Sequence, residues 1–133
     1  MPLAFRIGYA ALVTRITAPQ FAVEAARIAQ DHKCEDVVLL DLRGISMITD
    51  YVVICTGTSD RQMATVADRV TEYGRRVGEK PFGLSGYGGD SWIVLDFIDV
   101  VIHVFSRSSR EYYDLELLWG DAPRLQWARS ETA

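Results

Sequence analysis

The chain has 133 residues, of which 49% are hydrophobic and 24% are charged, and its formal net charge is −4. A chain of this length and composition forms one domain with a packed core, which excludes disordered and fibrous proteins. Binding nucleic acid through the phosphate backbone needs an excess of lysine and arginine, so the negative charge argues against that class.

The cysteines and the start of the chain indicate where the protein works. Cys34 and Cys55 are too few for a disulfide framework, and no pair of CxxC motifs indicates a zinc site. A reducing, cytoplasmic location fits this usage best. The apolar stretch at residues 7–13 lies between two arginines and is too short to span a bilayer. We therefore expect residues 1–16 to form a poorly ordered or variable N-terminus.

The first predicted elements are a helix and two strands. A capping-box spacing at Thr17 opens an amphipathic stretch that runs to about Lys33. The apolar runs at residues 36–42 and 51–57 are rich in valine, leucine and isoleucine. Such continuous runs are typical of strands that are buried on both faces of a sheet.

A second capping box at Ser59 begins the clearest helix of the sequence, and Gly78 is placed to end it in a left-handed conformation. The charged side of this helix predicts a solvated surface, with contact to RNA as the alternative. The glycine-rich stretch 80–90 leaves room for one short edge strand. The apolar runs 91–97 and 99–105 follow with almost no spacing, which demands an antiparallel hairpin.

The end of the chain predicts one more helix. A third capping box at Ser108 opens it, and Gly120 ends it. Residues 124–133 then form a C-terminal tail, anchored at most by Leu125 and Trp127.

The order of these elements predicts the fold class. We expect a single domain over residues 17–123 of the α/β (α+β) class, with a mixed sheet of about five strands flanked by about three helices.

Acidic residues are concentrated in the last third of the chain. Between Gly89 and Asp121 seven acidic residues stand against two arginines, a net charge of −5, while the remainder is close to neutral. Such a concentration favours a basic protein partner over bare RNA. The alternative is that these carboxylates are scattered over a solvated surface.

Residues that could carry out catalysis are scarce. His32 lies at the end of a predicted helix, and His103 lies inside an apolar strand, where a hydrogen-bonded structural role is the commoner one. The motifs HExxH, GxSxG and GxxxxGK[ST] are absent from the sequence. We therefore predict that the protein is not an enzyme and uses no cofactor and no metal.

One enzyme class remains as an alternative hypothesis. The turn at residues 57–60 (GTSD) leads into a helix N-terminus, where free backbone N–H groups can hold a phosphate. A nucleotidyltransferase would also need paired carboxylates for magnesium, and Asp96 and Asp99 are the nearest candidates. The two capping residues explain this turn without any ligand.

A set of aromatic and acidic residues near the end of the chain predicts a protein interface. Large rings supply buried contact area, and neighbouring carboxylates select a basic partner. The alternative is that Trp119 and one of the two tyrosines face the core. The set consists of Trp92, Asp96, Tyr112, Tyr113 and Trp119.

Three stretches of the sequence resemble the ribosomal silencing factor family, also called RsfS or Iojap: ITDYVVICTGTSDRQ, GGDSWIVLDFIDVVIHVF and REYYDLELLWGDAP. The resemblance covers roughly Ala18 to Pro123. It implies a sheet fold related to nucleotidyltransferases without their active site. It also implies a protein that binds the fourteenth large-subunit ribosomal protein, blocks joining of the small subunit, and represses translation when nutrients are short. Homodimers are a further implication.

The resemblance also assigns roles to particular residues. The family's motif positions fall on Thr49, Asp50, Tyr51, Trp92, Asp96, Arg110, Tyr113, Leu115, Glu116 and Trp119. The residues that we expect to bind the partner are Trp92, Asp96, Asp99, Arg110, Tyr113, Glu116 and Trp119.

One position departs from the family's pattern. The chain has Ile98 where the family usually has glycine in the turn of the hairpin. Because a β-branched residue resists positive φ, we expect another turn type or a shifted turn boundary here.

Overall fold

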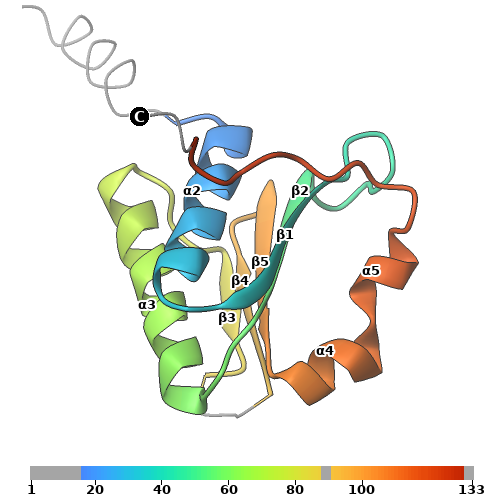
Figure 1. Cartoon of the computed structure of the whole chain (residues 1–133). Helices are drawn as coiled ribbons and strands as arrows, with labels where there is room; N and C mark the ends of the chain where they lie inside the picture. The colour runs from blue at the N-terminus through green and yellow to red at the C-terminus, as the bar shows by residue number, and fades with distance from the viewer. Residues whose placement is uncertain (1–15, 88–90, 131–133) are drawn as a thin grey trace, which may run out of the picture.

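A mixed five-stranded sheet lies between two unequal layers of helices in the computed structural model, which describes residues 16–87 and 91–130 (Figure 1). In chain order the elements are α2 (Ala18–Asp31), β1 (Glu35–Asp41), β2 (Tyr51–Thr56), α3 (Asp60–Arg76), β3 (Gly83–Ser85), β4 (Trp92–Asp96), β5 (Val100–Phe105), α4 (Arg107–Tyr113) and α5 (Leu115–Leu118). The predicted fold class is confirmed. The expectation of a poorly ordered or variable N-terminus concerns residues 1–16, and the structure describes only Ile16 of these.

The order of the strands in the sheet is β1-β2-β5-β4-β3. Neighbouring strands are antiparallel except for β2 and β5, which are parallel because the chain crosses over through α3 between them. All six residues of the central strand β2 are buried, as its continuous apolar run predicts. The close runs of the predicted hairpin form β4 and β5, and the glycine-rich stretch contributes the edge strand β3.

Helices α2 and α3 cover one face of the sheet, and their ends follow the predicted signals. The Thr17 hydroxyl accepts a hydrogen bond from the Gln20 N–H at 3.3 Å, and the Thr17 N–H donates to Gln20 Oε1 at 3.1 Å. In α3 the Ser59 side chain caps the start, and Gly78, with φ of 83°, follows the end. Among the residues that the structure describes, no helix is long and apolar enough to cross a membrane.

The opposite face of the sheet carries a second, smaller hydrophobic cluster. The α4–α5 segment covers it through Leu115 and Trp119 (Figure 1). The start of α4 differs from the predicted start at Ser108. The N-cap is Ser106, whose hydroxyl accepts from the Ser109 N–H at 3.2 Å, so the prediction that the helix starts at Ser108 is wrong. The buried members of the cluster are Val38, Leu40, Leu42, Val52, Ile54 and Phe105.

The last helix is also broken in two, where the sequence predicts one continuous helix. Asp114 has φ of 45°, a left-handed conformation that aspartate tolerates better than most residues. The break turns the chain so that Leu115 packs on the sheet while Tyr112 stays 82% exposed. In a single straight helix Tyr112 and Leu115, three positions apart, would lie on the same side. Such a helix could not bury one of them and expose the other.

The segment after α5 runs along the outer edge of β1 (Figure 1). The Leu125 N–H donates to the Leu39 carbonyl oxygen at 2.8 Å, and Trp127 Nε1 donates to the Val37 carbonyl oxygen at 3.2 Å. Arg27 Nε of α2 in turn donates to the Trp127 carbonyl oxygen at 2.8 Å. These bonds cover an edge that would otherwise expose unpaired backbone groups. Leu125 and Trp127 therefore act as the anchors of this segment.

The turn between β4 and β5 places Ile98 in the conformation that the sequence argues against. Its φ is 73°, and the Asp99 N–H donates to the Phe97 carbonyl oxygen at 3.0 Å, which makes a tight three-residue turn. The Asp96 carboxylate accepts from the Ile98 N–H at 2.8 Å. The expectation that the turn avoids a positive φ at Ile98 is wrong. The strand pairing, which ends at Asp96 opposite Val101, leaves only this short connection.

Replacing Ile98 with glycine is expected to raise the free energy of unfolding by about 1 kcal/mol. A left-handed conformation costs a residue with a Cβ about 1–2 kcal/mol, and the extra freedom of glycine in the unfolded chain offsets part of the gain. Ile98 is 56% exposed, so little buried contact is lost. Urea unfolding of both proteins at pH 7 measures the difference. The matched control, Ile98→Ala, keeps the Cβ and should gain far less. A glycine variant less stable than the parent would contradict this account of the turn.

Candidate functional site

The face of β4 and β5 that points away from α2 and α3 is only partly covered. Trp92, Val94 and Asp96 alternate onto this face and are half-buried, whereas the residues between them are buried. In β5, Phe105 lies opposite Trp92 and His103 lies opposite Val94. The α4–α5 segment covers the β1 and β2 side of this face (Figure 1), whereas the β4 and β5 residues on it are half-buried, apart from buried Phe105.

Aromatic rings gather where this strip meets α4. The Trp92 ring lies 4.9 Å from the Phe105 ring and 4.5 Å from the Tyr113 ring, centroid to centroid. Tyr112 meets Tyr113 edge to face at 5.0 Å. Phe105 is buried, but Tyr113 is 48% exposed and Tyr112 is 82% exposed. We call these four rings together with His103 the aromatic cluster. Its inner rings belong to the core and its outer rings face solvent.

His103 orients the central ring of the aromatic cluster. Trp92 Nε1 donates a hydrogen bond to His103 Nδ1 at 3.0 Å. Burial lowers the pKa of His103 to about 4, and the nearby Asp96 carboxylate opposes this shift only in part. His103 is therefore neutral at pH 7, with its ring proton on Nε2 and Nδ1 free to accept. The structural reading of this histidine fits the geometry, since the residue fixes the indole of Trp92.

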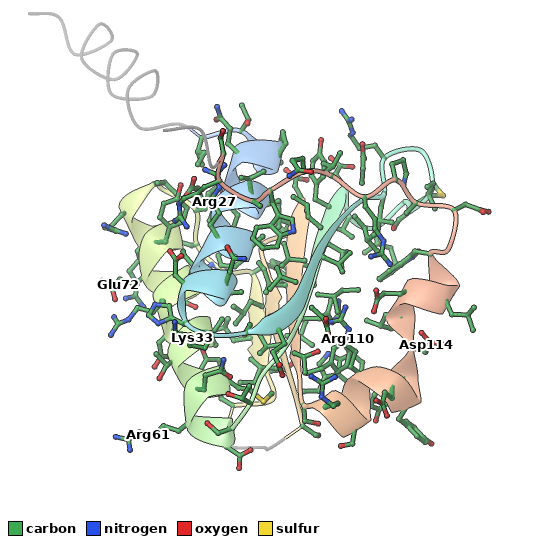
Figure 2. All side chains as sticks on the ribbon, in the orientation of Figure 1. Arg27, Lys33, Arg61, Glu72, Arg110 and Asp114 are labelled. Carbon is green, nitrogen blue, oxygen red and sulfur yellow. The ribbon has the colours of Figure 1, made fainter. Side chains whose placement is uncertain are left out.

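Arg110 ties the α4–α5 segment to the sheet. Its guanidinium donates to the Asp36 carbonyl oxygen and, at 2.9 Å, to Thr56 Oγ1. It also forms a salt bridge of 2.9 Å with Glu116, whose other oxygen lies 3.3 Å from Arg124. Figure 2 shows Arg110 between the helices and the sheet. We call Arg110, Asp36, Thr56 and Glu116 the Arg110 network.

Two of the expected partner-binding residues thus point inward. The side chains of Arg110 and Glu116 are only 12% and 27% exposed. Trp119 is half-buried and packs against the second hydrophobic cluster, which agrees with the core alternative for this ring. These three residues lie where they can position the aromatic cluster, and only their outer edges are open to direct contact with a partner.

Asp96 and Asp99 lie at the other end of the β4–β5 hairpin. Asp96 is four positions after Trp92, which corresponds to about 13 Å along a strand. The Asp96 carboxylate is occupied by the Ile98 N–H. Asp99 is exposed, and its carbonyl oxygen accepts from the N–H groups of Asp50 and Tyr51. The structure therefore brings Trp92 and Tyr113 together and places both aspartates apart from them.

Exposed apolar and acidic side chains extend the surface along the α4–α5 segment. Leu117 and Leu118 are 77% and 71% exposed, although neither is among the site residues predicted from the sequence. The signal that could have indicated them is the run LELL, which has too many leucines for one buried stripe. Glu111 and Asp114 are exposed on the same segment, and Figure 2 marks Asp114 at the break between the two helices.

The GTSD turn offers little support to the nucleotide hypothesis. The Thr58 N–H donates to Gln62 Oε1 at 2.9 Å, and the Gln62 N–H donates to Ser59 Oγ at 3.1 Å. Side chains of the protein therefore already occupy amides that a phosphate would use. Within residues 16–87 and 91–130, no group of three or more histidine, cysteine, aspartate or glutamate side chains is arranged to hold a metal ion.

Comparisons with known proteins show similarity over most of the chain. The family described as "Ribosomal silencing factor during starvation" matches residues 15–133. The chain is 40% identical over 99 residues to the ribosomal silencing factor RsfS of Bacillus subtilis, which covers 74% of this chain and 84% of the relative. Identity to RsfS of Halalkalibacterium halodurans is 41% over 107 residues, or 80% and 89% of the two chains. A crystal structure from Chromobacterium violaceum matches with a TM-score of 0.75 at 28% identity, over 86% of this chain and 95% of that chain.

Proposed function

Because the chain belongs to the ribosomal silencing factor family, we propose that it binds the large ribosomal subunit and keeps the small subunit from joining. The proposed contact on the ribosome is the fourteenth large-subunit ribosomal protein, and the proposed result is repression of translation when nutrients are limited. The names of the bacterial relatives support the ribosome as the target. The choice of contact and the mechanism rest on the sequence resemblance and on the surface described above.

The observation that carries this proposal is the half-exposed aromatic cluster on a partly covered sheet face. Tyrosine and tryptophan rings that are partly packed in the protein provide rigid contact area at low entropic cost. Tyr112, Leu117 and Leu118 continue the apolar surface, and Glu111 and Asp114 add exposed negative charge beside it. A surface of this kind fits a partner that is basic and offers an apolar groove.

The proposed action needs no catalytic step. A folded domain that occupies the subunit interface excludes the small subunit by its volume, and its effect follows the fraction of large subunits occupied. We therefore propose that the protein is a regulator and not an enzyme. The expected dependence on occupancy distinguishes this mechanism from catalysis, because a catalyst would act at amounts far below those of the ribosome.

The direct experiment measures subunit joining. Purified large and small subunits are mixed with increasing amounts of the full chain and separated on a sucrose gradient. The 70S peak should fall as the protein approaches stoichiometry with large subunits, and the protein should sediment with the free large subunits. A pull-down with the purified fourteenth large-subunit protein at two salt concentrations identifies the contact and its electrostatic share. Unchanged joining at saturating protein would rule out the proposed function.

The Trp92→Ala variant should bind large subunits about 30-fold more weakly, a loss of about 2 kcal/mol. The substitution removes the ring that supports Tyr113 and that faces solvent at the β4 edge of the aromatic cluster. Binding is measured by co-sedimentation at several protein concentrations. Circular dichroism and urea unfolding confirm that the variant is folded, because Trp92 also packs on Phe105.

The matched control for this variant is Phe82→Ala. Phe82 is 76% exposed and lies beside the edge strand β3, outside the aromatic cluster. Its removal should leave the affinity for large subunits unchanged. If Trp92→Ala keeps full affinity, Trp92 is not part of the contact. Equal losses in both variants would show that the effect is not specific to the aromatic cluster.

The proposal extends to location and assembly. We propose that the free protein is a homodimer in the cytoplasm, as the family resemblance implies. Sedimentation velocity of the purified full chain over a range of concentrations measures the assembly. A species with the mass of one chain at all concentrations would remove the dimer from the proposal without touching the ribosome contact.

A further inference from the structure

A cavity of about 550 Å³ lies between the α4–α5 segment, the start of β1 and the end of β2. We infer that this cavity binds a small zwitterion, a free α-amino acid. The carboxylate of the ligand contacts Arg110 and Arg124. Its ammonium group lies between Glu111 and Asp114. The volume is within the range of small-molecule sites. Neither the family resemblance nor the proposed ribosome contact assigns a role to this cavity.

Arg110 is a deep positive charge in the cavity, since only 12% of its side chain is exposed. Its Nε and Nη2 both contact Glu116 Oε1, at 3.0 and 2.9 Å. Its Nη1 donates to the Asp36 carbonyl oxygen and to Thr56 Oγ1. One N–H of Nη2 therefore has no acceptor in the part of the chain that the structure describes. Thr56 is 1% exposed, and no described residue accepts its hydroxyl proton. A ligand carboxylate provides the acceptors that these donors lack.

Positive charge is in excess at this end of the cavity. Arg110 and Arg124 both pair with Glu116, at 2.9 and 3.3 Å, and within the described residues neither pairs with a second carboxylate. Two guanidinium groups thus share one negative charge. The Arg124 side chain is 66% exposed, so most of its donors are open to a ligand. Guanidinium groups bind carboxylates through short, charge-assisted hydrogen bonds, which makes this end suited to a carboxylate.

Negative charge is in excess on the α4 side of the cavity. Glu111 and Asp114 are exposed, and their carboxylates form no hydrogen bond or salt bridge with any residue that the structure describes. Asp114 is three positions after Glu111 and four after Arg110, so the three side chains are neighbours on the helix. Figure 2 shows Asp114 at the break of the segment and Arg110 toward the sheet. An ammonium group has three N–H donors and can bridge both carboxylates.

The lining selects a molecule that carries both charges. A simple anion would meet four acidic side chains in this cavity, and a simple amine would meet three arginines. An α-amino acid carries its carboxylate and its ammonium group on the same carbon, so the two charges lie as close together as the two ends of the site. Val37 and Val38 add a small apolar area to the lining, which can contact the ligand side chain.

A bound amino acid would connect α4 to the segment after α5. Glu111 and Asp114 belong to α4 and its end, whereas Arg124 belongs to the segment that runs along β1. A ligand that binds only the folded arrangement stabilises it. We therefore expect amide hydrogen exchange over residues 107–118 to slow when the ligand is bound.

The test records amide NMR spectra of the ¹⁵N-labelled full chain while each common L-amino acid is added alone. At least one of them should shift the signals of residues 36–38 and 107–116 saturably, with a dissociation constant on the order of 1 mM or tighter. Signals of α2 and α3 should stay in place. No saturable shift with any amino acid, or shifts confined to other parts of the chain, would overturn the inference.

Capped analogues test the need for both charges. The amino acid that binds is compared with its N-acetyl derivative, which lacks the positive charge, and with its amide, which lacks the negative charge. Each should bind more weakly by about 10-fold or more, because a charged group of the protein loses its partner. Equal binding of the amide would assign the cavity to basic groups alone. Equal binding of the N-acetyl derivative would assign it to anions, and either result overturns the zwitterion.

Variants test the ammonium side of the site. Glu111→Gln and Asp114→Asn keep the size of exposed side chains, and asparagine tolerates the left-handed conformation of position 114. The double variant should bind the amino acid about 10-fold more weakly or worse. The control, Glu72→Gln on α3 across the sheet, should bind like the parent. Full affinity in the double variant, or an equal loss in the control, would contradict the assignment.

Discussion

The Arg110→Met variant is expected to lose about 3 kcal/mol of unfolding free energy. Methionine keeps the apolar stem of the side chain but removes every donor of the Arg110 network. Thr56 Oγ1 and the Asp36 carbonyl oxygen lose their bonds, and Glu116, 27% exposed, keeps only Arg124 at 3.3 Å. Removing one partner of a largely buried ion pair costs about 3–5 kcal/mol, and the remaining arginine places this case at the lower end. Urea unfolding at pH 7 measures the loss.

The loss should be local in origin. Neither α4 nor α5 contains a buried residue, so packing alone holds these short helices weakly. Amide hydrogen exchange should therefore accelerate over residues 107–118 in the variant and stay unchanged in α2 and α3. Binding to large ribosomal subunits should fall as well, because Tyr112 and Tyr113 are carried by α4.

Arg107→Met is the matched control. Arg107 also lies in α4, and it forms a salt bridge of 2.8 Å with Glu35. Its side chain is 55% exposed, however, and exposed salt bridges contribute little to stability. The control should unfold almost like the parent. A double-mutant cycle with Glu116→Gln adds a second check, since the two changes should be strongly non-additive. Equal stability losses at both arginines would contradict the role assigned to the Arg110 network.

The elements that the sequence predicts correctly are those with strong local signals. The capping box at Thr17 and the cap at Ser59 start α2 and α3, and Gly78 follows the end of α3 in the left-handed conformation. The apolar run of β2 becomes a strand buried throughout. In each case the residues that make the signal also make the contacts, so no distant part of the chain is needed to interpret them.

Tertiary constraints explain the errors. Serines at 106, 108 and 109 are similar candidates for a cap, and only the end of β5 decides that Ser106 is used. Ile98 takes a left-handed conformation because the pairing of β4 with β5 fixes the length of the turn, which outweighs the preference of one residue. A local preference of about 1–2 kcal/mol is small beside the packing of a whole hairpin.

The candidate site was predictable in its residue types but not in its arrangement. The sequence groups Trp92 with Asp96, yet strand geometry puts them at opposite ends of β4, while α4 brings Tyr113 to Trp92. The inward position of Arg110 depends on Asp36 and Thr56, which are 74 and 54 residues away along the chain. Such long-range partners leave no spacing pattern in a single sequence.

Lowering the pH from 7.5 to 4 is expected to cost about 3 kcal/mol of unfolding free energy through His103, of which about 2 kcal/mol is lost by pH 5. The folded pKa of about 4 lies below the ordinary value of 6.5 because the half-buried imidazole is desolvated. Between these values the unfolded chain binds a proton that the folded chain excludes. Stability from this group is therefore complete above pH 6.5 and is lost as the pH falls toward 4. Urea unfolding at pH 7.5, 6 and 5 measures the slope.

Other groups act in a different pH range. Hydrogen bonds from arginines lower the pKa values of Asp31 and Asp41 below their ordinary value of 3.8. Their contributions are present above that value and are lost only in more acidic solution, so they do not overlap the range between pH 6.5 and 5. A slope in that range therefore reports on His103.

The matched variant is His103→Gln, whose amide oxygen can accept from Trp92 Nε1 but cannot titrate. Its unfolding free energy should change far less between pH 7.5 and 5, and an unaltered slope would show that another group is responsible. Protonation of the native histidine would place a second donor against the indole N–H, so the bond that orients Trp92 exists only while His103 is neutral. At acidic pH, binding of the wild-type protein to large subunits should therefore weaken more than binding of the glutamine variant. The reason is that protonation of His103 both destabilises the fold and breaks the hydrogen bond that orients Trp92 in the aromatic cluster.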